Sequence, residues 1–161
     1  MSTSTLKTEH AGPHTVSRSV QVAAPVADLF ALIADPHRHS ELDGSGTVRD
    51  VKPETVERLT LGSKFGMSMK FGIKYSMVSE VVEFEKDRRI AWQSRPPSSL
   101  GAKFGGGRIW RYELEPVEGG TRVRESWDIT HEKIKFFIRP ARKKTRKSME
   151  KTLARIEDLV A

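Results

Sequence analysis

The residue best suited to chemistry in this sequence is Glu125, which alternates with Val123 and Trp127 in an otherwise apolar strand pattern. Alternation places these three side chains on the same face of a strand, the face that turns inward. A carboxyl group in a protein interior must be paired with a cation, protonated, or in contact with a wet cavity. Glu125 is therefore the candidate for a group that orients a bound molecule or transfers a proton.

Basic and hydroxyl side chains fall in the same inward phase and could complete a site around Glu125. On the helical wheel of the C-terminal segment, Arg142 is the basic residue in phase with the apolar face. Further inward-phase groups are Arg18, Arg108, Tyr75 and Tyr112. A few such anchors in an apolar pocket can orient a carbonyl or carboxylate, or assist an aldol-type cyclisation by general acid–base catalysis. Two alternatives stay open: a purely internal Glu–Arg pair, or a β-bulge that turns Glu125 outward.

Other catalytic classes lack their motifs here. The sequence has no Gly-rich loop followed by Lys and Ser or Thr, no nucleophile elbow, no His–Glu pair at zinc spacing and no cysteine. Asp35, His37 and His39 alternate in a predicted loop, but no further ligand of evident position accompanies them, which is typical of solvated histidines. We expect no metal and no cofactor, and we assign no catalytic residue.

The C-terminal segment, residues 138–161, must cover these groups. Its apolar residues recur at three- and four-residue steps and are Ile138, Met149, Leu153, Ile156 and Val160. Pro140 suits a first helical position, where a missing N–H has no cost. The pattern predicts a helix of about 30 Å. One apolar face of this length must pack against a sheet.

Most of the preceding chain alternates in the manner of short strands. The predicted strands are residues 16–22, 48–51, 57–61, 64–71, 73–84, 90–92, 110–114 and 121–129. A change of phase near Phe84 predicts a bulge. A short helix over residues 26–33 and a further helical turn over residues 37–42 follow the first strand.

The predicted domain organisation is simple. Residues 1–14 are rich in Ser and Thr and carry too few apolar groups to repay ordering, which predicts a disordered tail. Residues 15–161 then form a single α+β domain with an antiparallel sheet. No apolar run approaches the roughly 18 residues of a membrane span, and the N-terminus lacks the apolar core of a signal peptide, so we predict a cytoplasmic protein.

The net charge of +7 is concentrated at the C-terminus, since residues 131–161 hold ten Lys and Arg against four Asp and Glu. The basic cluster over residues 139–147 contains no aromatic residue, which disfavours nucleic acid as a partner. Lys143, Lys144 and Lys147 lie on the outward side of the helical wheel. We expect them to make a weak contact with an anionic membrane surface.

Four phrases resemble the START-like, helix-grip superfamily known as SRPBCC, in particular its polyketide cyclase/dehydrase and lipid-transport branch. They are VSRSVQVAAPVADLFALIADP (16–36), EVVEFEKDRRIAWQS (80–94), GGTRVRESWD (119–128) and MEKTLARIEDLV (149–160). The resemblance implies a curved antiparallel sheet of about seven strands wrapped round the long C-terminal helix. It also implies two short helices after the first strand and an apolar cavity between sheet and helix.

Apolar and aromatic side chains in inward phase are the candidates for the lining of that cavity, since Met and aromatic residues suit pockets for variable apolar molecules. With the polar groups above, the predicted lining is Phe65, Met67, Met69, Phe71, Tyr75, Met77, Trp92, Trp110, Tyr112, Glu125, Trp127, Arg142, Met149 and Leu153. The alternative is that these side chains simply fill a core.

The leading functional hypothesis is binding, and possible transport, of an apolar or amphipathic small molecule such as a lipid or polyketide. One alternative is a polyketide cyclase/dehydrase-type lyase. The other is a partner-binding module that uses the basic C-terminal helix.

Overall fold

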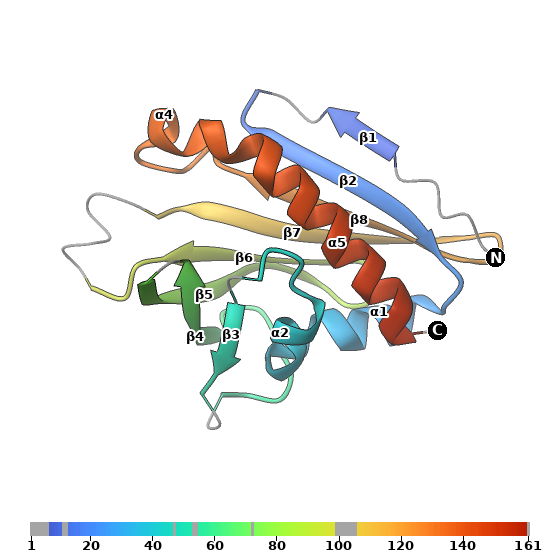
Figure 1. The fold of residues 1–161 in the computed structure, drawn as a ribbon. Coiled ribbons are helices and arrows are strands. Elements are labelled where there is room, and N and C mark those ends of the chain that lie inside the picture. Colours follow the sequence, from blue (N-terminus) through green and yellow to red (C-terminus); the bar gives the residue numbers. More distant parts are fainter. Residues whose placement is uncertain are drawn as a thin grey trace.

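The computed structural model describes residues 7–10, 13–46, 48–52, 55–71, 73–98 and 106–160. Within them one antiparallel sheet has the strand order β1-β2-β8-β7-β6-β5-β4-β3 (Figure 1). The strands are β1 (Lys7–His10), β2 (Thr15–Val22), β3 (Val48–Val51), β4 (Lys64–Phe71), β5 (Ile73–Glu85), β6 (Arg89–Arg95), β7 (Arg108–Val117) and β8 (Gly120–Asp128). The α-helices are α1 (Val26–Ile33), α2 (His39–Leu42), α4 (Lys135–Ile138) and α5 (Arg142–Val160). Two 3₁₀ turns are η1 (Pro36–Arg38) and η2 (Arg139–Ala141).

Helix α5 crosses one face of the sheet, where it contacts β2 and β8, and its later part meets α1 and α2 (Figure 1). Its buried side chains are Met149, Thr152, Leu153 and Ile156, which lie on the face that the apolar periodicity predicts. Pro140 lies in η2, so α5 itself begins only at Arg142. The predicted α+β helix-grip fold, with two short helices after the first long strand, is confirmed.

The N-terminal edge of the sheet differs from the prediction of a disordered tail over residues 1–14. Lys7–His10 form β1, which pairs antiparallel with β2 so that Lys7 lies opposite Ser19 and His10 opposite Val16. An edge strand offers unpaired backbone N–H and C=O groups, and a polar segment can satisfy them without burying apolar side chains. Residues 1–6, 11 and 12 lie outside the described residues.

The middle of the chain contains one confirmed irregularity and one wrong prediction. The register of β5 against β6 shifts between Val81 and Glu83, which confirms the bulge near Phe84. The strand predicted over residues 57–61 is absent from the structure, which describes this segment as irregular. Leu59 is instead buried, and its N–H donates to the carbonyl oxygen of Ala34 at 2.8 Å. Packing against the end of α1 has therefore replaced sheet pairing.

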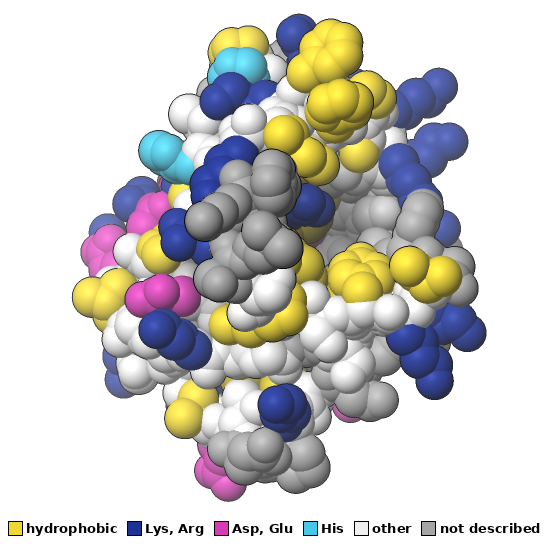
Figure 2. Space-filling model, turned by 90° about the vertical axis from the view of Figure 1, so that its left-hand side faces the viewer, with side chains coloured by type: hydrophobic (Ala, Val, Ile, Leu, Met, Phe, Trp, Pro, Cys, Tyr) yellow, Lys and Arg dark blue, Asp and Glu magenta, His cyan; other side chains and the backbone are white. Residues whose placement is uncertain are grey.

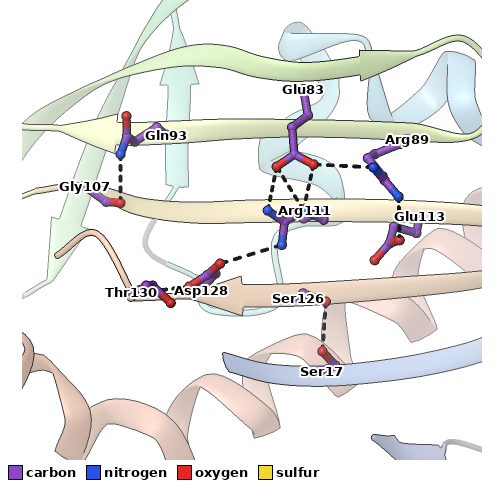
Figure 3. Close-up of polar contacts among 10 residues, drawn as sticks. All are labelled: Ser17, Glu83, Arg89, Gln93, Gly107, Arg111, Glu113, Ser126, Asp128 and Thr130. Carbon is purple, nitrogen blue, oxygen red and sulfur yellow. Dashed lines mark hydrogen bonds and ion pairs between the residues drawn. The ribbon is translucent and has the colours of Figure 1, made fainter. Parts of the chain in front are cut away.

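Ion pairs hold the face of the sheet opposite α5 (Figure 3). Arg111, which alternates with the inward Trp110 and Tyr112, donates to Glu83 from Nε at 3.0 Å and from Nη2 at 2.5 Å. Hydrogen bonding to Glu83 raises the pKa of Arg111. These charged groups of the outer face are thus paired with one another. We therefore expect a ligand site on the inner face.

Gly44 is where the loop after α2 comes closest to α5. Its N–H donates to Thr152 Oγ1 at 2.8 Å, and a Cβ added there would lie 2.5 Å from the Thr152 nitrogen and would clash with the carbonyl oxygen of Ser148. We expect Gly44→Ala to lower the free energy of unfolding by about 1–3 kcal/mol, because α5 and the loop must separate. Urea denaturation measures this loss. Gly66→Ala is the control, since its added Cβ comes no closer than 3.9 Å to its nearest contact. Equal effects of the two changes would contradict this close approach.

Candidate functional site

Glu125 lies on β8, on the inner face of the sheet. It is buried, and the continuous register places Tyr112 of β7 and Arg18 of β2 on either side of it. Tyr112 Oη donates to Glu125 Oε1 at 3.1 Å. The second oxygen, Oε2, is buried and has no hydrogen-bond partner within the described part of the chain. The alternative of a bulge that turns Glu125 outward is therefore wrong.

Burial controls the protonation of this pair. It raises the pKa of Glu125 to about 8, although the hydrogen bond from Tyr112 acts in the opposite direction. Burial and the nearby Glu125 charge raise the pKa of Tyr112. Glu125 is consequently mostly protonated at neutral pH, and a neutral carboxyl group can both donate and accept a hydrogen bond. Its free oxygen can thus meet a hydroxyl or a carbonyl group of a ligand.

Of the arginines in inward phase, Arg18 and Arg108 have carboxylate partners other than Glu125. Arg18 Nε donates to Glu150 Oε1 of α5 at 3.1 Å, and Arg108 Nε lies 3.5 Å from Glu132 Oε2. Arg142 Nε is buried and makes no hydrogen bond among the residues described. Across those same ranges no salt bridge connects Glu125 to an arginine, which contradicts the alternative of an internal Glu–Arg pair.

Aromatic rings extend from Tyr112 toward the short helices. The ring centroids of Tyr112 and Trp92 are 5.6 Å apart, and His39 stacks on Trp92 at 4.9 Å. Phe65 meets Trp92 edge-on at 5.7 Å. The prediction that His39 is a solvated loop residue is wrong, because it is buried here with Nε2 2.8 Å from the carbonyl oxygen of Ile33. Burial lowers the pKa of His39, so its ring is neutral.

Asp35, His37 and His39, which alternate in the sequence, make separate contacts in the structure. The Asp35 carboxylate accepts from the backbone N–H of His37 at 3.0 Å, and His37 Nε2 lies 3.0 Å from the carbonyl oxygen of Thr55. His39 faces the interior as described. Over the described ranges, no group of three His, Asp or Glu side chains is arranged to hold a metal ion.

The predicted lining residues differ in how deeply they lie. The buried ones are Phe65, Trp92, Tyr112, Glu125, Trp127, Met149 and Leu153. The partly buried ones are Met69, Met77, Trp110 and Arg142. Tyr75 is 38% exposed, near the start of β5. Met67 and Phe71 belong to β4, opposite Met77 and Ile73, and their side chains lie outside the description. Contact of these residues with a ligand stays a prediction.

Buried polar features that the sequence did not predict are the Ser79–Ser94 pair, the indole N–H of Trp127 and the carboxylate of Glu132. Ser79 and Ser94 are buried and share a hydroxyl–hydroxyl hydrogen bond of 2.8 Å. Trp127 Nε1 is buried without a hydrogen-bond partner in the described ranges. Glu132 is buried and accepts from the N–H of Gly106 at 2.7 Å, which fixes the chain just before β7. Strand alternation could have revealed the serine pair, but no pattern identifies Glu132.

An open hollow of about 450 Å³ lies beside α4, lined by Phe136, Phe137, Arg139, Pro140 and Arg142. Figure 2 shows this end of the molecule, with hydrophobic side chains gathered at the top over α4, a hollowed surface below them, and Lys and Arg side chains along its edge. Arg142 is the predicted site residue that lines this hollow, and its Nε is buried.

The antiparallel sheet that grips a C-terminal helix is the helix-grip fold of the START-like SRPBCC superfamily. The family described as polyketide cyclase / dehydrase and lipid transport matches residues 13–161, and the chain belongs to this family.

Individual proteins are similar to this chain in sequence or in fold. The Mycobacterium tuberculosis (strain H37Rv) protein Rv0088 is 41% identical over 159 residues, which cover 94% of this chain but only 66% of that protein. Protein Ms6760 of Mycobacterium smegmatis is similar in fold, with a TM-score of 0.71 at 16% identity over 97% of this chain and 96% of its own. The Polyketide_cyc-like protein Cgl2372 of Corynebacterium glutamicum has a TM-score of 0.55 at 24% identity, with 93% of each chain covered.

Among the helices that the structure describes, none combines the length and the apolar character needed to cross a membrane.

Proposed function

We propose that the protein binds an apolar or amphipathic small molecule, such as a lipid or a polyketide, on the inner face of the sheet with Glu125 and Tyr112 as polar anchors. The observation that carries this proposal is Glu125 Oε2, a buried oxygen without a hydrogen-bond partner among the described residues. Leaving such an atom unsatisfied costs about 1–3 kcal/mol. A ligand hydroxyl or carbonyl group at this point would recover that free energy.

The surroundings of Glu125 suit an adaptable apolar ligand. Trp92, Trp127 and Met149 are buried on the same side of the sheet. Because Oε2 is fully enclosed, a ligand reaches it only when neighbouring side chains move. Met149 packs in the cluster that contains Trp127, and methionine is the apolar side chain that changes shape most readily. The family description, which includes lipid transport, supports the same class of ligand.

Tryptophan emission tests the proposal, because Trp92, Trp110 and Trp127 all belong to this face. We expect a flavonoid, which carries a carbonyl group, to change the emission on titration, and a polycyclic hydrocarbon to do so as well. Glu125→Leu should weaken flavonoid binding about 5- to 100-fold and leave hydrocarbon binding within about twofold, since only the polar anchor is lost.

Glu115→Gln is the matched control, because Glu115 is an exposed carboxylate of β7 that accepts a hydrogen bond from Arg122 Nη1 at 2.7 Å. It should bind both compounds as the parent does. Native mass spectrometry of the purified protein looks for a ligand that is already bound. Unchanged flavonoid affinity in Glu125→Leu, or no emission change with either compound, would contradict the proposal.

Cyclase or dehydrase activity is the second candidate function. The pKa of Glu125, raised to about 8, lies close to neutral pH, where a general acid works best. In this hypothesis the Glu125 carboxyl group donates its proton to a β-hydroxyl group of the ligand, which leaves as water, and the resulting carboxylate accepts the α-proton, while Tyr112 holds the carboxyl group in place. Mass spectrometry detects a dehydrase, because it releases its ligand lighter by one water molecule and a binding protein releases it unchanged. Liquid chromatography detects a cyclase, because its product has the same mass as the ligand but a different retention.

A further inference from the structure

Helix α4 and the residue before it present an apolar surface to solvent, which we call the α4 patch and define as Ile134, Phe136 and Phe137. Phe136 is 84% exposed, Phe137 is 75% exposed and Ile134 is 39% exposed. The two phenylalanine rings contact each other edge-to-face, with centroids 5.8 Å apart, and no residue of α4 is buried. Transfer of two adjacent aromatic rings from water into apolar surroundings is strongly favourable in free energy.

The charge around the α4 patch has one sign. Residues 133–147 contain eight Lys and Arg and no Asp or Glu. The rest of the chain holds 20 Lys and Arg against all 21 Asp and Glu, so this segment accounts for more than the whole net charge of +7. Arg139, Lys143, Lys144 and Lys147 are exposed. A solubilising surface normally mixes both signs, whereas this one is complementary to an anion-rich surface.

The combination of apolar and basic groups fits an anionic lipid bilayer. The α4 patch lies at one end of the molecule (Figure 1), where Phe136 and Phe137 are largely exposed and line the open hollow beside α4. A folded protein would need a matching pocket for the two rings. A bilayer surface accepts aromatic side chains at headgroup depth and attracts Lys and Arg to its phosphates.

We propose that α4 and the start of α5 dock the protein on anionic bilayers. Phe136 and Phe137 enter the boundary between headgroups and acyl chains, while Arg139, Lys143, Lys144 and Lys147 meet lipid phosphates. The sequence alone predicts a weak surface contact through Lys143, Lys144 and Lys147. The exposed rings of Phe136 and Phe137 add insertion of aromatic side chains into the bilayer. The hollow beside α4 then faces the bilayer, and, if the proposed ligand function holds, an apolar molecule can pass between membrane and interior.

Co-sedimentation of the full chain with vesicles tests the docking. We expect binding to vesicles of phosphatidylcholine with phosphatidylglycerol, little binding to phosphatidylcholine alone, and loss of binding in about 0.5 M salt. The double variant Phe136→Ala/Phe137→Ala should bind at least tenfold more weakly. The triple variant Lys143→Gln/Lys144→Gln/Lys147→Gln should lose at least as much. Its melting temperature should stay unchanged or rise, since positive charge is removed from a helix N-terminus.

The control variant Leu61→Ala/Lys86→Gln removes one exposed apolar and one exposed basic side chain far along the chain from α4, and it should bind as the parent does. Undiminished vesicle binding by the phenylalanine variant would overturn the proposal. So would equal binding to neutral vesicles, or tighter binding to single-stranded DNA than to anionic vesicles. A dimer that dissociates in the phenylalanine variant, without any vesicle binding, would assign the patch to a second copy of the chain.

Flavonoid titration of the phenylalanine variant without vesicles separates this proposal from the ligand function. Unchanged flavonoid affinity is expected, since Phe136 and Phe137 are exposed and Glu125 is buried. Failure of vesicle binding would leave that titration unaffected, and failure of the flavonoid titration would leave the docking result standing.

Discussion

Glu125→Gln is expected to stabilise the protein increasingly as the pH rises from 4.5 to 8. The folded protein keeps the Glu125 proton up to a pKa of about 8, whereas the unfolded chain releases it near 4.5. Between these values unfolding releases a proton, so the parent loses stability as the pH rises. Glutamine has no such proton. The difference in free energy of unfolding should therefore grow to about 5 kcal/mol and become constant above pH 8.

Urea denaturation of parent and variant between pH 4 and pH 9 measures this difference. His39 has a lowered pKa and removes stability as the pH falls below its ordinary value of 6.5, but it is present in both proteins and cancels. Tyr112→Phe supplies a second check. The hydrogen bond from Tyr112 lowers the pKa of Glu125, so its loss should raise that pKa. The pH at which the protein stops losing stability should then be higher than in the parent. A difference that does not change with pH would show that Glu125 is ionised in the folded protein.

Leu153→Ala and Ile156→Ala should each lower the free energy of unfolding by about 2–5 kcal/mol. Both side chains are fully buried in the hydrophobic core between α5, α1 and the sheet, and their truncation leaves a cavity under α5. Thermal and urea unfolding measure the loss. Leu159→Ala on the same helix, 37% exposed, is the control and should cost less than about 1 kcal/mol. Melting temperatures within about two degrees of the parent for both core variants would show that α5 does not pack where the structure places it.

Periodicity predicted the parts of the fold in which one face is buried. Leu153 and Ile156 follow from the helical wheel, Glu125 from strand alternation, and the bulge before Phe84 from a change of phase. Each of these residues has its position decided by neighbours in the chain. This is why the long helix, the positions of most strands along the chain and the inward direction of Glu125 were predictable.

Other features depend on contacts that leave no local pattern. Lys7–His10 joins the sheet through backbone hydrogen bonds, which any polar sequence can make. Leu59 and His39 are buried because α1 and Trp92 lie beside them, and neither neighbour is close in the sequence. Phe136 and Phe137 would ordinarily be assigned to a core, and only the path of the chain around α4 shows that they face water.

The burial of α5 is uneven, so its two halves differ in how firmly they are held against the rest of the domain. All four buried side chains lie between Met149 and Ile156, whereas residues 142–148 contain none. The later half is also tied to the loop after α2, through Thr152 to Gly44 and through Arg155 to the carbonyl oxygen of Asp43. Segments with few buried contacts open at a small fraction of the global free energy of unfolding. The first two turns of α5 can therefore separate from the sheet and return many times during the life of one folded molecule, while the last three turns keep the domain intact.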